Sequence, residues 1–288
     1  MSTPGAGGPP PSAWKCEQVD VEAYARRVGL RGPAWPVGAD EDALCLLHRA
    51  HASAIPFDNL DFVTGVPVAL DPPALVAKLC RRPRGGCCHE HNLLFGCIAQ
   101  RQGFHVDRLA ARVLLGGEGP RPRTHMALRV RHGRSDWLCD VGFGVERFLD
   151  PLELSDGATC EQAGRRYRVR ALRQPFWAVE LKEQRGWTAM YSFTLEPQHP
   201  MDFTVAHHFL STHPRSMLRR SPLLQLTTPE RRLRLHGLQI TEDSLTSRAT
   251  RTLTPFTLRS ELAALGIRLP SGQLSDLARR LFPTPKER

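Results

Sequence analysis

Arg84-Gly85-Gly86-Cys87-Cys88-His89-Glu90-His91-Asn92 is the stretch that most restricts what this chain can be. Two glycines come before a run of reactive side chains, and an apolar segment at residues 93–98 follows. This pattern predicts a tight turn and then a helix that starts near Cys88 and ends at Gly103. A cysteine in the first turn of a helix lies at the positive end of the helix dipole, which stabilises a thiolate. Cys88 is therefore the candidate nucleophile.

Upstream of this stretch the sequence predicts further helices. Asp20 can cap one of them, Asp40 or Asp42 can cap another, and Pro73 suits the first turn of a third. We therefore expect a helical bundle over residues 17–102. Residues 1–16 are rich in Pro, Gly and Ser and hold little apolar surface, so we expect them to form a flexible tail.

Downstream of Gly103 the apolar pattern changes from helical to short strand-like runs separated by Gly, Pro and Asp. Consecutive strands without helices between them predict an antiparallel β-barrel over residues 103–205. For residues 206–288 we expect a C-terminal α/β lid, with strands at 232–240 and 245–253 and helices at 258–265 and 274–281. The predicted architecture is a three-part α/β enzyme in which helices and antiparallel strands occupy separate segments, which is the α+β arrangement.

Two residues of the predicted barrel can serve the cysteine. His125 opens a strand whose Met126, Leu128 and Val130 alternate toward the core, and Asp140 ends the next strand before the Gly142-Phe143-Gly144 turn. A thiolate is most useful when a histidine shares its proton and a carboxylate orients that histidine. The sequence thus predicts a Cys88–His125–Asp140 triad where bundle and barrel meet.

Composition limits the other possibilities. The chain has 288 residues and a formal charge of +10, and 35 of its 39 basic residues are arginines spread along the sequence. A scattered excess of arginine does not outline a nucleic-acid-binding stripe. No apolar run reaches the roughly 18 residues of a membrane span, and no secretory signal is visible, so we expect a cytoplasmic protein without nucleic-acid or membrane partners.

The eight cysteines are few for this length, so free thiols are expected. Apart from Cys87 and Cys88 they are interpreted as small buried apolar residues. The cluster of Cys87, Cys88, His89, His91 and Cys97 lacks the ligand spacing of a zinc site, so no metal is predicted.

With these motifs in place, the sequence resembles the arylamine N-acetyltransferases. That family combines Arg-Gly-Gly-x-Cys-x-Glu-x-Asn, a Thr-His strand and an Asp-Val-Gly-Phe-Gly turn, which here read 84–92, 124–125 and 140–144. Residues 55–60 and 210–214 match as well. The resemblance extends from about Asp20 to the C-terminal end, and it implies a transglutaminase-like or cysteine-protease-like Cys-His-Asp core.

The resemblance implies a ping-pong transfer of an acetyl group from acetyl-CoA, a co-substrate, through an acetyl-cysteine to an arylamine or hydrazine. Cys88 is then the nucleophile, His125 the proton carrier and Asp140 the orienting group. By analogy Phe57 and Phe143 line the acceptor slot, and Gly144 and residues 211–214 lie near CoA. Structural support is expected from Arg84, Asp58, Glu90 and Asn92.

Three departures from the family pattern concern particular positions. Cys87 replaces an aromatic residue, Asp58 stands where glutamate is usual, and Val145-Glu146 follows Gly144 where relatives often have another glycine. Asp58 would have to pair with Arg84 through a side chain one methylene shorter. Glu146 could change the mouth of the pocket.

Other functions remain open at this stage. The nearest is an amide synthase on the same scaffold, which takes a long acyl chain from a carrier protein and closes a ring. A cysteine hydrolase would use the same triad with water as the acceptor. A basic binding module would keep its function without Cys88. The sequence does not determine the physiological acceptor, the donor chain length, the oligomeric state or the pathway.

Overall fold

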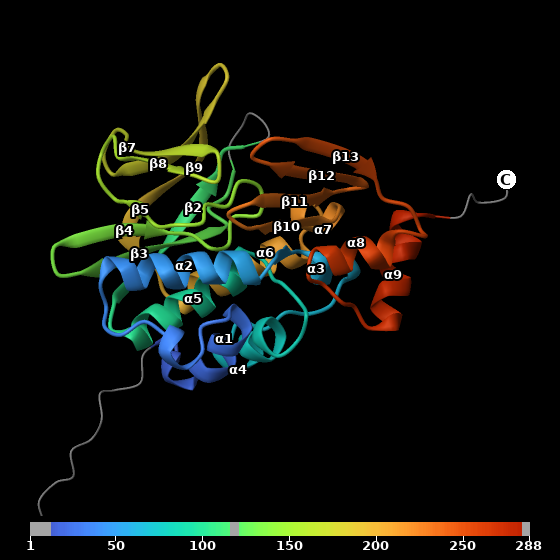
Figure 1. Cartoon of the computed structure of the whole chain (residues 1–288), viewed down its shortest axis with the longest axis horizontal. Coiled ribbons are helices and arrows are strands. Elements are labelled where there is room, and N and C mark those ends of the chain that lie inside the picture. Colours follow the sequence, from blue (N-terminus) through green and yellow to red (C-terminus); the bar gives the residue numbers. More distant parts are fainter. Residues whose placement is uncertain (1–12, 116–120, 284–288) are drawn as a thin grey trace, which may run out of the picture.

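The computed structural model describes residues 13–115 and 121–283, and its N-terminal third is helical (Figure 1). Asp20 and Asp40 cap two of the helices as predicted, each accepting a hydrogen bond from the backbone N–H three residues ahead. The helical elements of this part are η1 (Cys16–Gln18), α1 (Val21–Val28), η2 (Gly32–Ala34), α2 (Glu41–Ala54), α3 (Leu60–Thr64), α4 (Pro72–Leu75), the π-helical turn η3 (Val76–Cys80) and α5 (Cys88–Gln102). Helix α5 starts and ends where the sequence predicts, with Gly103 as a left-handed C-cap.

The central unit is an eight-stranded antiparallel sheet in the order β5-β4-β3-β2-β9-β8-β7-β6. Its edge strands β5 and β6 contact each other, so the sheet nearly closes into the predicted barrel. The strands are β2 (His105–Val113), β3 (His125–His132), β4 (Ser135–Cys139), β5 (Leu152–Glu153), β6 (Thr159–Gln162), β7 (Arg165–Ala171), β8 (Phe176–Glu183) and β9 (Gly186–Pro197).

The third unit is built on a five-stranded antiparallel sheet in the order β1-β10-β11-β12-β13, with α8 and α9 beside it (Figure 1). Its elements are β1 (Phe57–Asp58), α6 (Pro200–Thr212), α7 (Met217–Arg220), β10 (Leu223–Thr227), β11 (Arg231–His236), β12 (Gln239–Ser244), β13 (Arg248–Thr252), α8 (Leu258–Ala264) and α9 (Ser271–Leu281). The single strand expected at 232–240 is wrong, because Gly237 turns the chain (φ 60°) into a β11–β12 hairpin.

The unit boundaries drawn from the sequence do not coincide with the elements. Strand β1 comes from the expected bundle, yet it pairs with β10 of the third sheet. The expected boundary at residues 205–206 falls inside α6. The division of the chain into domains therefore stays a prediction. The helical part, the eight-stranded sheet and the five-stranded sheet are nevertheless distinct.

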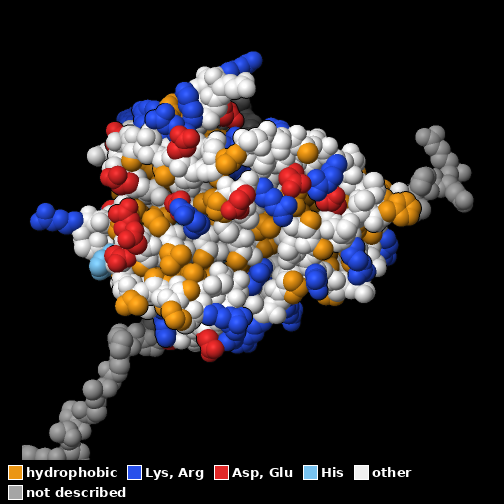
Figure 2. Space-filling view, viewed as in Figure 1, with side chains coloured by type: hydrophobic (Ala, Val, Ile, Leu, Met, Phe, Trp, Pro, Cys, Tyr) orange, Lys and Arg blue, Asp and Glu red, His pale blue; other side chains and the backbone are white. Residues whose placement is uncertain are grey.

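Charged side chains are mixed on the face of the molecule shown in Figure 2, with Lys and Arg interspersed among Asp and Glu. This distribution matches the scattered arginines of the sequence. Among the described residues, no helix has the length and apolar character needed to cross a membrane.

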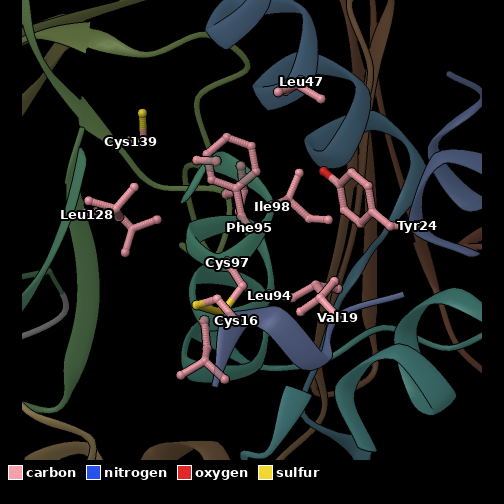
Figure 3. Packing of buried hydrophobic residues seen from close by; sticks show 14 of the residues in the cluster. Cys16, Val19, Tyr24, Leu47, Leu94, Phe95, Cys97, Ile98, Leu128 and Cys139 are labelled. Atoms are coloured by element: carbon pink, nitrogen blue, oxygen red, sulfur yellow. A yellow bond between two sulfur atoms is a disulfide. The ribbon is translucent and has the colours of Figure 1, made fainter. Parts of the chain in front are cut away.

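Helix α5 runs through the main core (Figure 3). Phe95 and Ile98 are fully buried on it, and they pack among Tyr24 of α1, Leu47 of α2 and Leu128 of β3. Burying such side chains contributes about 1.5–3 kcal/mol each. The helix that carries Cys88 is therefore held on several sides by elements distant in sequence.

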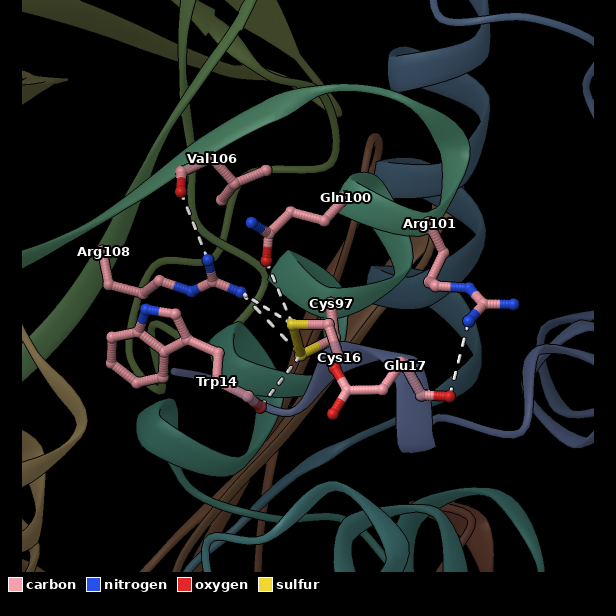
Figure 4. The surroundings of a disulfide bond; sticks show 8 residues. All are labelled: Trp14, Cys16, Glu17, Cys97, Gln100, Arg101, Val106 and Arg108. Carbon is pink, nitrogen blue, oxygen red and sulfur yellow. Dashed lines mark hydrogen bonds between the residues drawn. A yellow bond between two sulfur atoms is a disulfide. The ribbon is translucent and has the colours of Figure 1, made fainter. Parts of the chain in front are cut away.

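The prediction of free thiols is wrong for one pair, because Cys16 and Cys97 form a disulfide (Figure 4). The bond ties η1 to α5 across a sequence separation of 81 residues. The buried Arg108 points Nη2 at both sulfurs, and its guanidinium lies 4.7 Å from the centre of the Trp14 ring. Burial lowers the pKa of Arg108 to about 9.

The expected flexible tail also extends too far. Cys16 is buried and Trp14 packs against the main core, because the disulfide and the Arg108 contact hold this segment down. Residues 1–12 of the expected tail lie outside the described residues.

Candidate active site

The turn before Cys88 depends on its two glycines. A Cβ on Gly85 would lie 2.0 Å from the carbonyl oxygen of Pro56, and one on Gly86 would lie 2.8 Å from Glu90 Oε2. The backbone can approach β1 only without these side chains, and Asp58 N–H donates to the Gly86 carbonyl at 2.8 Å. Cys88 is then the first residue of α5 and lies at the helix N-terminus, where the positive end of the helix dipole stabilises an anion.

His125 and Asp140 meet at the end of the barrel next to this helix start. His125 Nε2 lies 2.6 Å from Asp140 Oδ2, and both side chains are buried. The Cys88 thiol lies 3.9 Å from the carbonyl oxygen of Thr124, the residue just before His125. The structure thus joins His125 of β3 to Asp140 at the end of β4, and it places the Cys88 thiol of α5 beside the residue that precedes His125.

The Asp140 carboxylate is held in its ionised form. Burial by itself raises the pKa of Asp140, but the His125 contact, the Asn92 amide at 2.8 Å and the Gly142 N–H at 3.0 Å lower it below its ordinary value. The Asn92 amide also donates to the Met126 carbonyl, and its oxygen accepts from Val141 N–H. Asn92 therefore links α5 to both barrel strands, as its supporting role predicts.

His48 holds the backbone of Asp140 from the opposite side. Its Nδ1 lies 2.7 Å from the Leu149 carbonyl and its Nε2 accepts from Asp140 N–H at 3.2 Å. A carbonyl can only accept, so Nδ1 carries the proton in a neutral ring. Burial lowers the pKa of His48 to about 4, which keeps the ring neutral.

Gly142 brings the Asp140 turn directly against the nucleophile. A Cβ on Gly142 would lie 2.8 Å from Cys88 Cα and 2.9 Å from the Cys88 carbonyl oxygen. No side chain larger than hydrogen fits there without moving the backbone. The glycine therefore sets the spacing between the start of α5 and the end of β4.

Cys87 and Cys88 are both buried, and Cys87 is the more enclosed of the two. Cys87 is fully buried, and burial raises the pKa of the Cys87 thiol well above its ordinary value. Its backbone N–H donates to Glu90 Oε2 at 2.9 Å, which closes the first turn of α5. A neutral buried thiol is a poor nucleophile, which argues against Cys87 in that role.

A buried ion-pair network fixes the stretch that leads to α5. Arg84 pairs with Asp58 at 3.1 Å and with Asp61 at 2.8 Å, so the shorter Asp58 side chain still reaches it. Lys78 bridges Asp61 at 2.6 Å and Glu90 at 2.7 Å. Burial lowers the pKa of Lys78, but Glu90 and Asp61 raise it above its ordinary value.

Aromatic rings flank the nucleophile and the base. Phe57 packs in one apolar cluster with Cys87 and Cys88, and a Cβ on Gly144 would lie 2.6 Å from its ring. The Phe143 ring is 5.2 Å from that of His125, in an edge-on contact. That Phe57 and Phe143 border an acceptor slot stays a prediction.

Sequence reasoning missed several residues that build this site, namely His48, Asp61, Lys78 and Gly142 in its contact with Cys88. Gly142 is part of the 140–144 motif, so the sequence could have indicated it. No sequence pattern marked His48, Asp61 or Lys78. Within residues 13–115 and 121–283, no group of three or more His, Cys, Asp or Glu side chains is arranged to hold a metal ion.

Comparisons with known proteins agree with this geometry. A family model described as N-acetyltransferase matches residues 40–263. The arylamine N-acetyltransferase of Mycolicibacterium smegmatis is 36% identical over 226 residues, which cover 76% of this chain and 80% of that protein. The crystal structure of the Nocardia farcinica arylamine N-acetyltransferase superposes with a TM-score of 0.85 at 35% identity, covering 94% of this chain and 98% of that one.

A further structural relative is the Mycobacterium marinum arylamine N-acetyltransferase in complex with CoA. It has a TM-score of 0.80 at 30% identity and covers 91% of this chain and 98% of that one. The fold and the site define an acyltransferase with a transglutaminase-like Cys-His-Asp core. The chain belongs to the arylamine N-acetyltransferase family. The amide synthase alternative is not favoured by these findings.

Proposed function

We propose that this enzyme transfers an acetyl group from acetyl-CoA to an arylamine or hydrazine by a ping-pong reaction through an acetyl-Cys88 intermediate. The observation that carries the proposal is the 2.6 Å contact between His125 and Asp140 beside the helix-borne Cys88. The CoA complex of the Mycobacterium marinum relative supports the donor.

His125 would exchange its proton with Cys88 through Nδ1, because Nε2 is engaged by Asp140. In the first half-reaction the Cys88 thiolate attacks the thioester carbonyl and the bond from that carbon to the CoA sulfur breaks. His125 gives its proton to the leaving sulfur, so CoA departs as the thiol. Backbone N–H groups at the start of α5 would stabilise the oxyanion.

In the second half-reaction the amine attacks the acetyl carbon and the bond to Cys88 Sγ breaks. His125 accepts the proton that the amine loses, which restores the starting thiolate–imidazolium pair. Aromatic amines are weakly basic, so they are present as free nucleophiles at neutral pH. Phe57 and Phe143 would form the apolar walls against which the aryl ring packs.

Arg84, Asp58, Glu90 and Asn92 would act by position and touch no substrate. Gly144 and residues 211–214 are proposed to border the donor, since the Gly144 backbone lies against Phe57 at the site. The cytoplasmic location and the absence of a metal requirement remain predictions.

Intact mass spectrometry tests this proposal directly. The protein is mixed with acetyl-CoA without an acceptor, and one acetyl group is expected on the wild type and on Cys87→Ala but not on Cys88→Ala. An arylamine should then remove the group. Acetylation that persists in Cys88→Ala would assign the chemistry to another residue, and no loading of the wild type would refute acetyl-CoA as the donor.

A further inference from the structure

A pocket lies between the barrel and the third unit. Residues 163–165 of the β6–β7 turn, 227–232 around the β10–β11 turn and 243–248 around the β12–β13 turn enclose a hollow of about 380 Å³. We call it the basic pocket. Small-molecule sites generally measure about 300–1,000 Å³, so the basic pocket has room for a small organic ligand.

Arginines outnumber carboxylates in the ion pairs in and directly beside this pocket, where Arg234 and Glu146 lie next to its lining. Glu146 alone pairs with Arg232 at 2.6 Å, with Arg234 at 3.1 Å and with Arg165 at 3.8 Å. Asp243 is shared between Arg234 at 3.1 Å and Arg248 at 3.4 Å. The four arginines thus face two carboxylates, which leaves two positive charges without a partner of their own.

The remaining charges around the pocket do not remove this excess. Arg231 pairs with Glu242 at 3.1 Å, and Glu242 also pairs with Arg251 at 3.2 Å. Glu230 adds a carboxylate at the rim, where it accepts a hydrogen bond from the Thr228 hydroxyl. Counting both, the described residues around the hollow still carry more positive than negative charge.

Two observations show that the positive charge is incompletely satisfied. Arg232 is 5% exposed, lines the pocket, and its Nε has no hydrogen-bond partner among the described residues. Burial lowers the pKa of Arg234, and although Glu146 and Asp243 raise it, the neighbouring Arg232 and Arg165 help to keep it below its ordinary value. An anion in the pocket would offset the excess positive charge that Arg232 and the neighbouring arginines create.

We propose that the basic pocket binds a phosphate group carried on a small organic molecule. Guanidinium groups bind phosphate through paired hydrogen bonds, and hydroxyl side chains at 227–228 and 244–247 add neutral donors. Orthophosphate alone would leave much of a 380 Å³ hollow unfilled. The ligand is therefore a phosphate ester or a diphosphate with an attached group.

Two sources of such a phosphate are possible, the acyl donor and a separate phosphorylated compound. Glu146, which holds three of the arginines, lies two residues after Gly144 of the candidate active site. The arginines of the basic pocket are therefore tied through Glu146 to the loop that borders Phe57. The assignment to the donor rests on the proposed function, whereas phosphate binding itself does not.

Isothermal titration calorimetry of the full chain with inorganic pyrophosphate at low salt tests the binding. The double variant Arg165→Gln/Arg248→Gln removes two partly exposed arginines of the pocket, and Arg26→Gln/Arg279→Gln removes two exposed arginines elsewhere. We expect saturable one-to-one binding that weakens at least fivefold in the pocket variant only. Absence of saturable binding, or equal weakening in both variants, would overturn the proposal.

Competition with CoA then separates the two sources. If CoA displaces pyrophosphate and the pocket variant raises KM for acetyl-CoA at unchanged kcat, the phosphate belongs to the donor. If both bind together, the pocket serves a separate phosphorylated compound. Either result supports the site, and a failure of acetyl transfer would leave the pyrophosphate titration unaffected.

Discussion

His125 Nε2 and Asp140 Oδ2 are 2.6 Å apart, and both side chains are buried. Asp140 is itself fixed by Asn92, by Gly142 N–H and, through its backbone, by His48. The carboxylate can therefore orient the imidazole without rearranging during the reaction, which is the condition for efficient electrostatic stabilisation.

Asp140→Asn should lower kcat/KM by about 10³- to 10⁴-fold, because an amide can hold His125 in the wrong tautomer and cannot stabilise its charged form. Steady-state acetylation of an aromatic amine checks the rate, and alkylation of Cys88 by iodoacetamide checks the loss of thiolate. Asp156→Asn, which changes an exposed carboxylate of the barrel, is the control. Activity within threefold of wild type in Asp140→Asn would contradict the role assigned to Asp140.

Gly142→Ala should damage both activity and stability, because the added Cβ would lie 2.8 Å from Cys88 Cα. We expect a loss of about 1–3 kcal/mol in the free energy of unfolding from overpacking, and roughly a 10²-fold lower kcat/KM from displacement of the nucleophile. Urea unfolding and steady-state kinetics measure the two effects.

Gly272→Ala provides the matched control, since a Cβ there meets nothing within 4 Å and the residue lies in α9. It should be neutral or stabilising by up to about 1 kcal/mol. If Gly142→Ala behaved like this control, the close approach of the two segments would be disproved.

The sequence predicts the parts of the site that depend on local signals. Cys88 could be placed because Gly85-Gly86 and Gly103 mark the two ends of α5, and His125 because it opens an alternating strand. Helix α6 carried a local signal as well, since Pro200 occupies its first turn. It was not predicted, because residues 103–205 were interpreted as barrel strands and the first element expected after them was the strand at 232–240.

Contacts between distant segments could not be predicted from one sequence. Strand β1 pairs with β10, and the register joins Phe57 to Gln225, although all the barrel strands lie between them in the sequence. Lys78 joins Asp61 to Glu90 only after three helices have packed. Neither arrangement leaves a periodic pattern in the chain, because both arise from tertiary packing.

The Cys16–Cys97 disulfide is a contact of this kind and leads to a testable stability difference. Cross-linking residues 81 positions apart restricts the unfolded chain, so Cys16→Ser should lower the free energy of unfolding by about 2–4 kcal/mol under oxidising conditions. The wild type in excess dithiothreitol should lose a similar amount, and Cys16→Ser should respond little to the reductant.

Cys45→Ser serves as the control, because Cys45 is a free, partly buried thiol. Urea unfolding of all three proteins with and without dithiothreitol provides the comparison. Equal stability of wild type with and without the reductant, with all thiols shown by mass to be reduced, would refute the stabilising role of the bond.

Acid stability should depend on Asp61. Burial raises the pKa of Asp61, but Lys78 and Arg84 lower it to about 2 from its ordinary 3.8. A depressed pKa stabilises the fold above the unfolded value and loses this contribution as the pH falls through the folded value. At about 1.4 kcal/mol per unit, Asp61 contributes about 2 kcal/mol above pH 5, and roughly half of that is lost by pH 3.

Urea unfolding between pH 6 and pH 3 measures this contribution. Asp61→Asn should be less stable than wild type at pH 6, because Lys78 and Arg84 each lose a partner, and its stability should fall less steeply with acid. Asp276→Asn changes a half-exposed carboxylate that pairs with the exposed Arg279, so its acid profile should follow the wild type. Parallel curves for Asp61→Asn and wild type would show that the buried network does not control acid unfolding, and the loss would then have to come from carboxylates elsewhere in the fold.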